Sequence, residues 1–310
     1  MKDADVELSR PPLSLTFPAV ASAARQRAAD YVSLAKPRLN FLVVVTAMVG
    51  YQLGLRGRVD LRNLMEALVG TALVAGGASG LNQVYERDTD GLMWRTRTRP
   101  LPDRRLSPAD ATIFSVTLAV IGVVLLAAGA NLLAAAVALG TLVSYIAVYT
   151  PLKRRSSLAT LVGAVPGALP PMIGWAAARG SLSIEGWALV AIVFCWQIPH
   201  FYAIAWMYRD DYLRAGFPLL PVVEPDGRRT GRQAVLFASA LVPVSLLPFL
   251  LHVAGPWYGA GAAVLSFGLL GLAIRFAVRR TTSRARQLFL GSITYLPLLW
   301  GLLIADRIRL

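Results

Sequence analysis

The sequence predicts an all-α protein that crosses a membrane several times. Of its 310 residues, 56% are hydrophobic and only 15% are charged, whereas about a quarter of a soluble domain is charged. The apolar residues gather in long runs with short polar segments between them, which is the pattern of membrane-spanning helices. The net charge of +14 does not indicate a nucleic-acid partner, because the basic residues lie in the short connections.

Nine apolar runs follow the N-terminal region, each close to the ~20 residues that a helix needs to cross a bilayer. The third and fourth are separated only by Gly129 and Ala130, so we expect a tight turn there. Prolines in the later runs are expected to kink helices and to leave backbone groups for neighbouring helices to satisfy. We place the runs at 39–55, 64–82, 109–128, 131–150, 158–178, 187–207, 232–253, 256–276 and 287–305.

The N-terminal region, residues 1–37, is mixed in charge and lacks a continuous apolar core, so it does not resemble a signal peptide. We expect a cytoplasmic tail. Residues 19–36 suit an amphipathic helix at the membrane surface, and a disordered tail is an alternative for residues 1–18. The rest of the chain, 38–310, is expected to form a single transmembrane domain.

The basic residues predict the orientation of the nine spans. With the N-terminus inside, 25 of the 31 Lys and Arg residues fall on the inner side and six on the outer side. Inner connections of membrane proteins carry such an excess of basic residues. For a protein of the bacterial inner membrane, this means a cytoplasmic N-terminus and a periplasmic C-terminus.

A row of polar residues follows the second apolar run. Asn82, Glu86 and Asp90 are spaced four apart, which places them on one face of a helix. Arg95 and Arg99 follow, and they are also four residues apart. Oxygen ligands of this kind suit a divalent cation such as Mg²⁺ that also binds substrate phosphates, and arginine binds the remaining phosphate oxygens. The alternative is a solvated loop that happens to be charged.

Two further polar stretches lie on the predicted inner side. Residues 196–223 place His200 within an apolar run and Asp211 just after it. A histidine in such a run is most often a hydrogen-bonded structural residue, with function as the alternative. The connection 149–155 contains Lys153 without a nearby acid in the sequence. It suits either lipid headgroups or a diphosphate.

Together, these stretches resemble the UbiA-type intramembrane prenyltransferases, over residues 31 to about 305. Asn-x3-Glu-x3-Asp at 82–90 resembles the first acidic motif of that superfamily, and RTRTRPLP at 95–102 resembles its continuation. The stretch WQIPHFYAIAWMYRDDYLRAGFPLLPV is similar to the second motif of the haem-farnesylating branch. LAKPR at 34–38, YTPLKR at 149–154 and GALPPMIGW at 167–175 also fit that branch. Two residues depart from the pattern: Glu86 stands where Asp is usual, and Ala159 where Asn is common.

This resemblance implies nine transmembrane helices around a central cavity that opens near the cytoplasmic face. It implies farnesyl diphosphate as donor, haem B as acceptor, membrane lipid around the protein and Mg²⁺ as cofactor. A downstream haem A synthase and oxidase assembly factors are candidate protein partners. The expected roles are Mg²⁺ binding by Asn82, Glu86, Asp90 and Asp211, diphosphate binding by Arg95, Arg99, Lys153 and Arg209, and acceptor binding by His200 and Tyr202.

Two other functions fit parts of the sequence. A prenyltransferase acting on a phenolic acid or a chlorin would share the acidic row and differ in the second stretch. A transporter of an anionic lipid or haem would use the charged connections as a gate. Transport would move a substrate without releasing diphosphate, so diphosphate release separates it from both enzymes.

Overall fold

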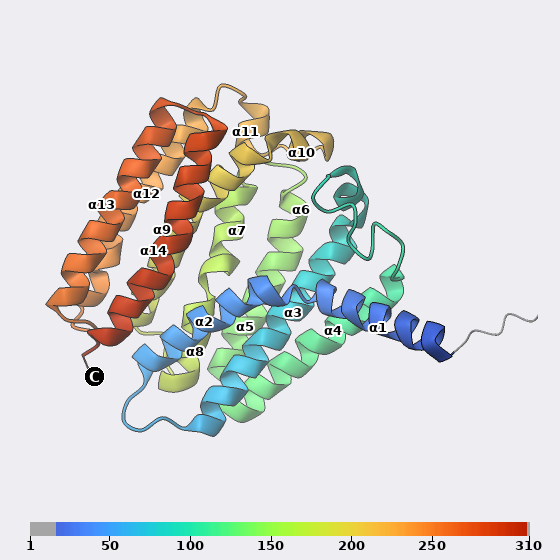
Figure 1. Cartoon of the computed structure of the whole chain (residues 1–310). Coiled ribbons are helices and arrows are strands. Elements are labelled where there is room, and N and C mark those ends of the chain that lie inside the picture. The colour runs from blue at the N-terminus through green and yellow to red at the C-terminus, as the bar shows by residue number, and fades with distance from the viewer. Residues whose placement is uncertain (1–16, 309–310) are drawn as a thin grey trace, which may run out of the picture.

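The computed structural model describes residues 17–308, and these form a helical bundle (Figure 1). Within this range the elements are all helices, apart from one isolated bridge between Ala254 and Arg307. Eight helices are long and apolar enough to cross a membrane. A ninth span results if residues 24–34 and 37–54, which meet at 43°, count as one bent span. The prediction of an all-α, multi-pass membrane protein is confirmed.

The helices follow the predicted runs closely. The third run becomes α4 with a π-helical segment, η1. The fourth becomes α5, η2 and α6, and the fifth becomes α7 and α8, which form one span. In chain order the elements are α1 Phe17–Leu34, α2 Pro37–Gly54, α3 Leu61–Leu92, α4 Pro108–Leu125, η1 Leu126–Ala130, α5 Leu132–Val143, η2 Ser144–Tyr149, α6 Thr150–Leu152, α7 Ala159–Ala168, α8 Pro170–Arg179, α9 Ile184–Met207, α10 Arg209–Arg214, α11 Leu220–Val223, α12 Arg228–Leu250, α13 Pro256–Val278 and α14 Thr282–Ala305.

The expected tight turn after α4 lies slightly later than predicted. The helix continues as η1 through Ala130, and the chain reverses at Asn131, whose backbone is extended. The Asn131 side chain accepts a hydrogen bond from the Ala134 N–H at 2.8 Å and donates one to the Ala176 carbonyl at 2.8 Å. One asparagine therefore caps α5 and joins it to the end of α8.

In the first half of the bundle, α2 and α8 cross in close contact. A Cβ atom on Gly50 would overlap the carbonyl oxygen of Pro171, and one on Gly174 would overlap that of Ala47. Small residues allow helix backbones to approach in this way within a membrane. The two glycines therefore determine how closely these helices pack.

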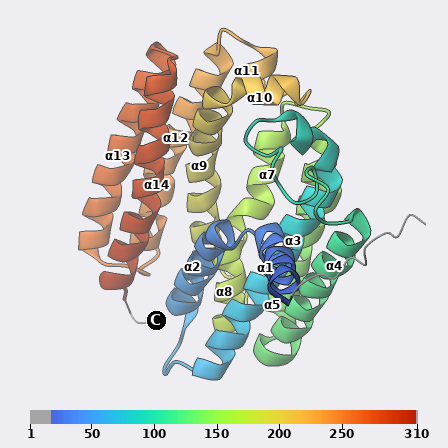
Figure 2. The same cartoon turned by 45° about the vertical axis from the view of Figure 1, so that its right-hand side comes forward.

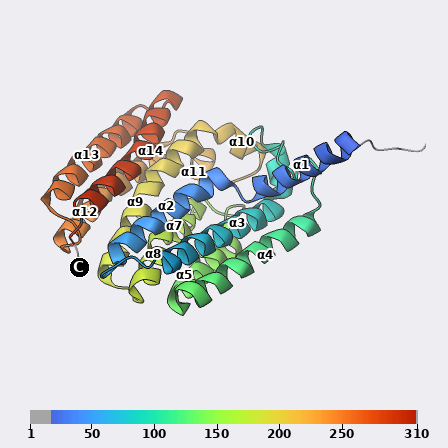
Figure 3. The same cartoon turned by 60° about the horizontal axis from the view of Figure 1, so that its bottom comes forward.

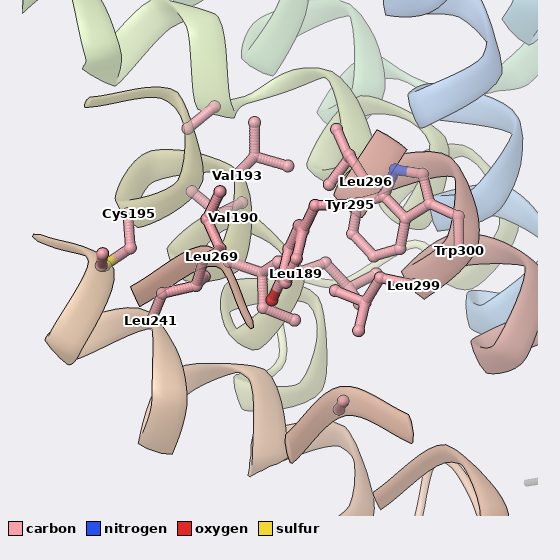
Figure 4. Close-up of a cluster of buried hydrophobic side chains, with 14 of the residues drawn as sticks. Leu189, Val190, Val193, Cys195, Leu241, Leu269, Tyr295, Leu296, Leu299 and Trp300 are labelled. Carbon is pink, nitrogen blue, oxygen red and sulfur yellow. The ribbon is translucent and has the colours of Figure 1, made fainter. Parts of the chain in front are cut away.

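In the second half, α9 packs against α12 and α14 around a large apolar core (Figure 4). Cys195 is buried there as a free thiol, as expected for a small core residue. A short polar chain crosses the same region, from Ser245 through Ser266 to the Tyr295 hydroxyl, with oxygen separations of 2.8 and 3.0 Å. Buried hydroxyls need such partners where water is absent.

Figures 1 to 3 show α3 and α4 at one edge of the bundle and α12 and α13 at the opposite edge. The connections 93–107 and 151–158 lie at the same end as α10 and α11. Helix α3 has 32 residues and is therefore about 48 Å long, whereas the hydrocarbon core of a bilayer is about 30 Å thick. Its last turns reach this end of the molecule.

The N-terminal region contains the expected helix, α1, which lies beside α3 and α4. Arg27 pairs with Asp110 at 3.4 Å, and Asp30 pairs with Arg105 at 3.1 Å. These ion pairs hold α1 against the first turn of α4 and the connection that precedes it. Its position at a membrane surface and the boundary at residue 37 stay predictions, and residues 1–16 lie outside the described part of the chain.

Candidate active site

The acidic row lies on one buried face of α3. Asn82, Glu86 and Asp90 expose only 4%, 2% and 1% of their surface, whereas Asp88, between the last two, is exposed. The four-residue spacing produces this face, because it advances each side chain by about 40° around the helix. Two carboxylates are therefore held away from water at one end of the bundle.

Each carboxylate has a cation beside it. The Lys153 ammonium lies 3.0 Å from both oxygens of Glu86, and Arg99 donates to Asp90 Oδ2 at 2.7 Å. Burial by itself lowers the pKa of Lys153, but the Glu86 carboxylate and then Tyr212 reverse this. The pKa of Lys153 therefore lies above its usual value, and the ammonium stays charged at neutral pH.

The amide of Asn82 is oriented by the π-helical segment η2. Thr150 Oγ1 donates to the Tyr145 carbonyl at 2.9 Å and accepts from Asn82 Nδ2 at 3.3 Å. This wide turn comes directly before Pro151, which has no N–H to continue an α-helical ladder. The arrangement turns Thr150 and Lys153 toward α3 and leaves the Asn82 oxygen as the free end of its amide.

The second motif folds over the segment that follows α3. Asp211 accepts a hydrogen bond from the Trp94 N–H at 3.3 Å and pairs with Arg214. Arg95 donates to the Tyr212 hydroxyl at 3.3 Å. Two stretches 117 residues apart therefore meet, and they bring Asp211 and Arg95 to the end of the bundle that holds the acidic row.

Arg209 has a different environment from the one expected of a diphosphate ligand. Its side chain is 46% exposed, 3.8 Å from Asp210, and lies over the Trp206 ring. Helix α9 ends at Met207 and α10 begins at Arg209, so the direction of the chain changes between them. Among the described contacts none joins Arg209 to the acidic row, and its predicted role has no geometric support.

His200 lies between α9 and α14 rather than against α3. Its Nδ1 is 2.8 Å from Ser292 Oγ, and its ring stacks on Trp196 at a centroid distance of 5.1 Å. Since the Ser292 hydroxyl donates to the Phe289 carbonyl at 2.6 Å, its oxygen accepts from Nδ1–H. This tautomer leaves the lone pair on Nε2 free for an acceptor molecule.

Tyr202, the other residue predicted to bind the acceptor, is 2% exposed. It packs in an apolar cluster with Ala164, Ile198 and Leu220, where α9 meets α7 and α11. Neither His200 nor Tyr202 contacts the acidic row directly in the described part of the chain. Their roles toward the acceptor stay predictions.

Lys36 is a residue at this end that the sequence did not single out as part of the site. It occupies the break between α1 and α2 with a left-handed backbone, φ 47°, and Gln83 fixes this break by donating to the Leu34 carbonyl at 2.8 Å. Burial, and then the Arg99 guanidinium, lower the pKa of Lys36 to about 8. The nearby carboxylates of Asp90 and Glu86 oppose this shift, so Lys36 is another basic residue close to the acidic row. The sequence signal that could have indicated Lys36 is its position as a basic residue directly before Pro37.

The residues suit a divalent cation that shares its ligands with a substrate. Asp90 Oδ1 is buried and has no hydrogen-bond partner among the described residues, so one carboxylate oxygen is free to bind an ion. Residues 17–308 contain no group of three His, Cys, Asp or Glu side chains that could hold a metal by themselves. Mg²⁺ usually combines one or two carboxylates with phosphate oxygens and water, which fits this arrangement.

The fold and the site define a multi-pass helical membrane protein with paired carboxylates and cations at one end of its spans. The model of the UbiA prenyltransferase family matches residues 43–302. A protoheme IX farnesyltransferase from Solibacter usitatus is 48% identical over 287 residues, covering 90% of this chain and 98% of the relative. The enzymes of that name from Koribacter versatilis and Myxococcus xanthus are 44% and 46% identical and cover 96% and 91% of this chain, and 97% and 95% of the relatives. The chain belongs to the UbiA prenyltransferase family.

Solved structures share the fold at low sequence identity. A digeranylgeranylglyceryl phosphate synthase superposes with a TM-score of 0.78 at 15% identity, covering 92% of this chain and all of the other. A UbiA homologue from Aeropyrum pernix gives 0.67 at 21% identity, covering 87% and 98%. One from Archaeoglobus fulgidus, bound to GPP and Mg²⁺, gives 0.61 at 16%, covering 89% and 99%.

Proposed function

We propose that this chain transfers the farnesyl group of farnesyl diphosphate to a vinyl group of haem B, with haem O and diphosphate as products. The observation that carries the proposal is the buried row on α3 in which Glu86 pairs with Lys153 and Asp90 with Arg99. Buried charges of both signs at the end of a membrane span are costly unless they bind something. The names of the curated relatives support the choice of farnesyl donor and haem acceptor.

On the donor side, the bond between farnesyl C1 and oxygen breaks, and its electron pair leaves with the diphosphate. Arg95, Arg99 and Lys153 bind the diphosphate and stabilise the negative charge that develops on it. Asn82, Glu86 and Asp90, with Asp211 from the second motif, would hold Mg²⁺, which supplies further positive charge at the leaving group. Arg209 is a weaker candidate, given its exposed position.

On the acceptor side, the π electrons of a haem vinyl group form the new carbon–carbon bond to farnesyl C1. Water then adds to the vinyl carbon nearer the ring and loses a proton, which gives a hydroxyethylfarnesyl substituent. The rings of Tyr145 and Tyr149, with centroids 5.3 Å apart and planes tilted by 32°, lie next to Thr150 and are suited to stabilise the allylic cation. His200 Nε2 would bind the haem, through the iron or a propionate.

The orientation that the basic residues predict would suit this reaction. It places the N-terminus and the site end on the cytoplasmic side of the inner membrane, where a soluble diphosphate would be released. The predicted central cavity would hold the farnesyl chain. The two described grooves lie elsewhere, on α13 and α14 and on α12 and α13, so the cavity stays part of the proposal.

The test is incubation of the purified protein with radiolabelled farnesyl diphosphate, haem B and Mg²⁺, followed by chromatography of the extracted pigments. We expect a more hydrophobic, labelled haem and an equimolar amount of diphosphate. A parallel reaction offers a phenolic acid in place of haem. Labelled phenol without labelled haem would indicate a prenyltransferase with another acceptor. Movement of the label between membrane leaflets without diphosphate release would indicate a transporter.

His200→Ala should lower haem O formation in a strain that lacks its own haem O synthase, while the protein stays in the membrane at its normal amount. Ser292→Ala should have a smaller effect in the same direction, because it only frees the ring to rotate. Hydrolysis of farnesyl diphosphate without acceptor should be unchanged in both variants. Normal haem O in His200→Ala would remove that histidine from the acceptor site and leave the reaction itself intact.

A further inference from the structure

A groove between α12 and α13 lies outside the site described above. These helices occupy the edge of the bundle opposite α3 and α4 (Figures 1 and 2). The groove has a volume of about 770 Å³, within the range of small-molecule sites, and it is open along one side. Arg228, Arg232 and Arg280 line its mouth, and the remaining lining is mostly apolar.

The mouth of the groove carries net positive charge. Arg280 is fixed by hydrogen bonds to the carbonyls of Asp226 and Ala277, at 2.8 and 2.5 Å. Arg228 lies 3.3 Å from the Asp226 carboxylate, which offsets one of the three guanidiniums. Arg232 is exposed, and among residues 17–308 it has no described ion pair. Two of the three positive charges are thus available to an anion.

The floor of the groove is apolar and extends toward the middle of the membrane. Helices α12 and α13 touch where a Cβ on Gly231 would lie 2.9 Å from the Ala277 Cα. From there the groove continues past Val235 and Leu236 to Ser239, which is about 10 Å along the helix from Arg232. Cations at the end of a span, with an open and mostly apolar groove below them, match a molecule with an anionic head and a hydrocarbon tail.

We propose that this groove binds an anionic phospholipid. Its phosphate is held by Arg228, Arg232 and Arg280, and one acyl chain lies along Val235, Leu236 and Ser239. Basic pockets between membrane helices bind acidic lipid headgroups in this manner. The choice of a lipid over a soluble anion rests on the apolar floor, which a free phosphate would leave uncovered.

The experiment is native mass spectrometry of the full chain released from nanodiscs that contain equal amounts of phosphatidylglycerol and phosphatidylcholine with matched chains. We expect phosphatidylglycerol to be retained in excess. Since each basic residue at such a surface contributes about fivefold in affinity, Arg232→Gln with Arg280→Gln should weaken retention about 30-fold. Arg286→Gln, an exposed arginine on α14 outside the groove, is the matched control and should change nothing.

A second variant, Ser239→Trp, keeps every arginine and fills the floor. It should also reduce phosphatidylglycerol retention, because the acyl chain loses its place, while farnesyl transfer stays normal and shows that the protein is folded. Equal retention of both lipids, or an excess that survives the double arginine variant, would overturn the proposal. Displacement of the lipid by equimolar inorganic phosphate would also overturn it. So would a result in which the groove is covered by a second copy of the chain and not by lipid.

Discussion

Glu86 and Asp90 show how single residues are used at this site. Each carboxylate is almost fully buried and has one cation at hydrogen-bonding distance. Desolvation of a buried pair can cancel its attraction, so such pairs are weak evidence for stability. We infer that these pairs are kept for binding, because each holds in place both a potential metal ligand and a potential diphosphate ligand.

Asp90→Asn should reduce farnesyl transfer about 100-fold or more, because it removes the charge and the free oxygen expected to bind Mg²⁺. The measurement is the initial rate of labelled haem formation over a range of Mg²⁺ concentrations. Asp88→Asn is the control, since Asp88 is exposed on the same helix turn, and it should stay within about threefold of the wild type. Comparable rates in the two variants would exclude Asp90 from the site.

Lys153→Met should destabilise the protein by about 3 to 5 kcal/mol, because it leaves the Glu86 carboxylate buried without its cation. Adding Glu86→Gln removes that charge and should restore most of the stability. Activity should not return in the double variant, since both groups are proposed to bind the donor or its Mg²⁺. Thermal unfolding in detergent and the transfer assay together provide the two readouts. A double variant no more stable than Lys153→Met would show that the unpaired Glu86 carboxylate does not cause the loss of stability.

The sequence predicted only part of the site at this scale. The common face of Asn82, Glu86 and Asp90 followed from helical periodicity, which is a local property. The contact of Trp94 with Asp211 joins residues 117 positions apart, and the change of direction after Met207 turns Arg209 outward. Such tertiary contacts leave no periodic signal. Lys36 was missed for the same reason.

The elements themselves were predicted well, because each span must be apolar over the thickness of a bilayer. Nine apolar runs correspond to eight single spans and one bent pair. Short helices such as α6 and α10 were not predicted, since they are too short for periodicity to show and depend on Pro151 and on packing. The close crossing of α2 with α8 was likewise not predicted from the sequence.

Gly174→Ala should push α2 and α8 apart and destabilise the protein by about 1 to 3 kcal/mol, the usual cost of overpacking. Gly140→Ala on α5 is the control, because a Cβ there meets no atom within 4 Å, and it should be neutral or slightly stabilising. The midpoint of thermal unfolding in detergent measures both. Equal midpoints would show that the α2 and α8 crossing tolerates a methyl group.

For the whole molecule, the positions of the connections explain the charge asymmetry. The connections 93–107, 151–158 and 208–227 lie at one end, together with the candidate site, and they contain most of the basic residues of the connections. The same residues would contribute both to the predicted orientation and to the proposed binding of the diphosphate. After α1, the acids at this end are confined to residues 86–110 and 210–226, the two stretches that contain Glu86, Asp90 and Asp211.

The orientation predicts that a reporter active only outside the cytoplasm will function when fused after Leu310, and that a cytoplasmic reporter will function when inserted at Gly227, between α11 and α12. Both follow from 25 basic residues on the inner side and six on the outer side. Fusions at both positions should reach similar amounts in the membrane. The opposite pattern of activities would invert the orientation and place the site end in the periplasm.

The length of α3 has a consequence for how the reaction ends. From Leu61 to Asn82 the helix rises about 32 Å, roughly the full hydrocarbon thickness. If the hydrocarbon core begins near Leu61, the acidic row begins near its other boundary. A diphosphate that leaves the site at this end passes into water. A haem that has gained a fifteen-carbon chain has no such exit and stays dissolved among the lipids. The two products therefore separate, one into water and the other into the lipid. This separation opposes the reverse reaction and requires no conformational change of the protein.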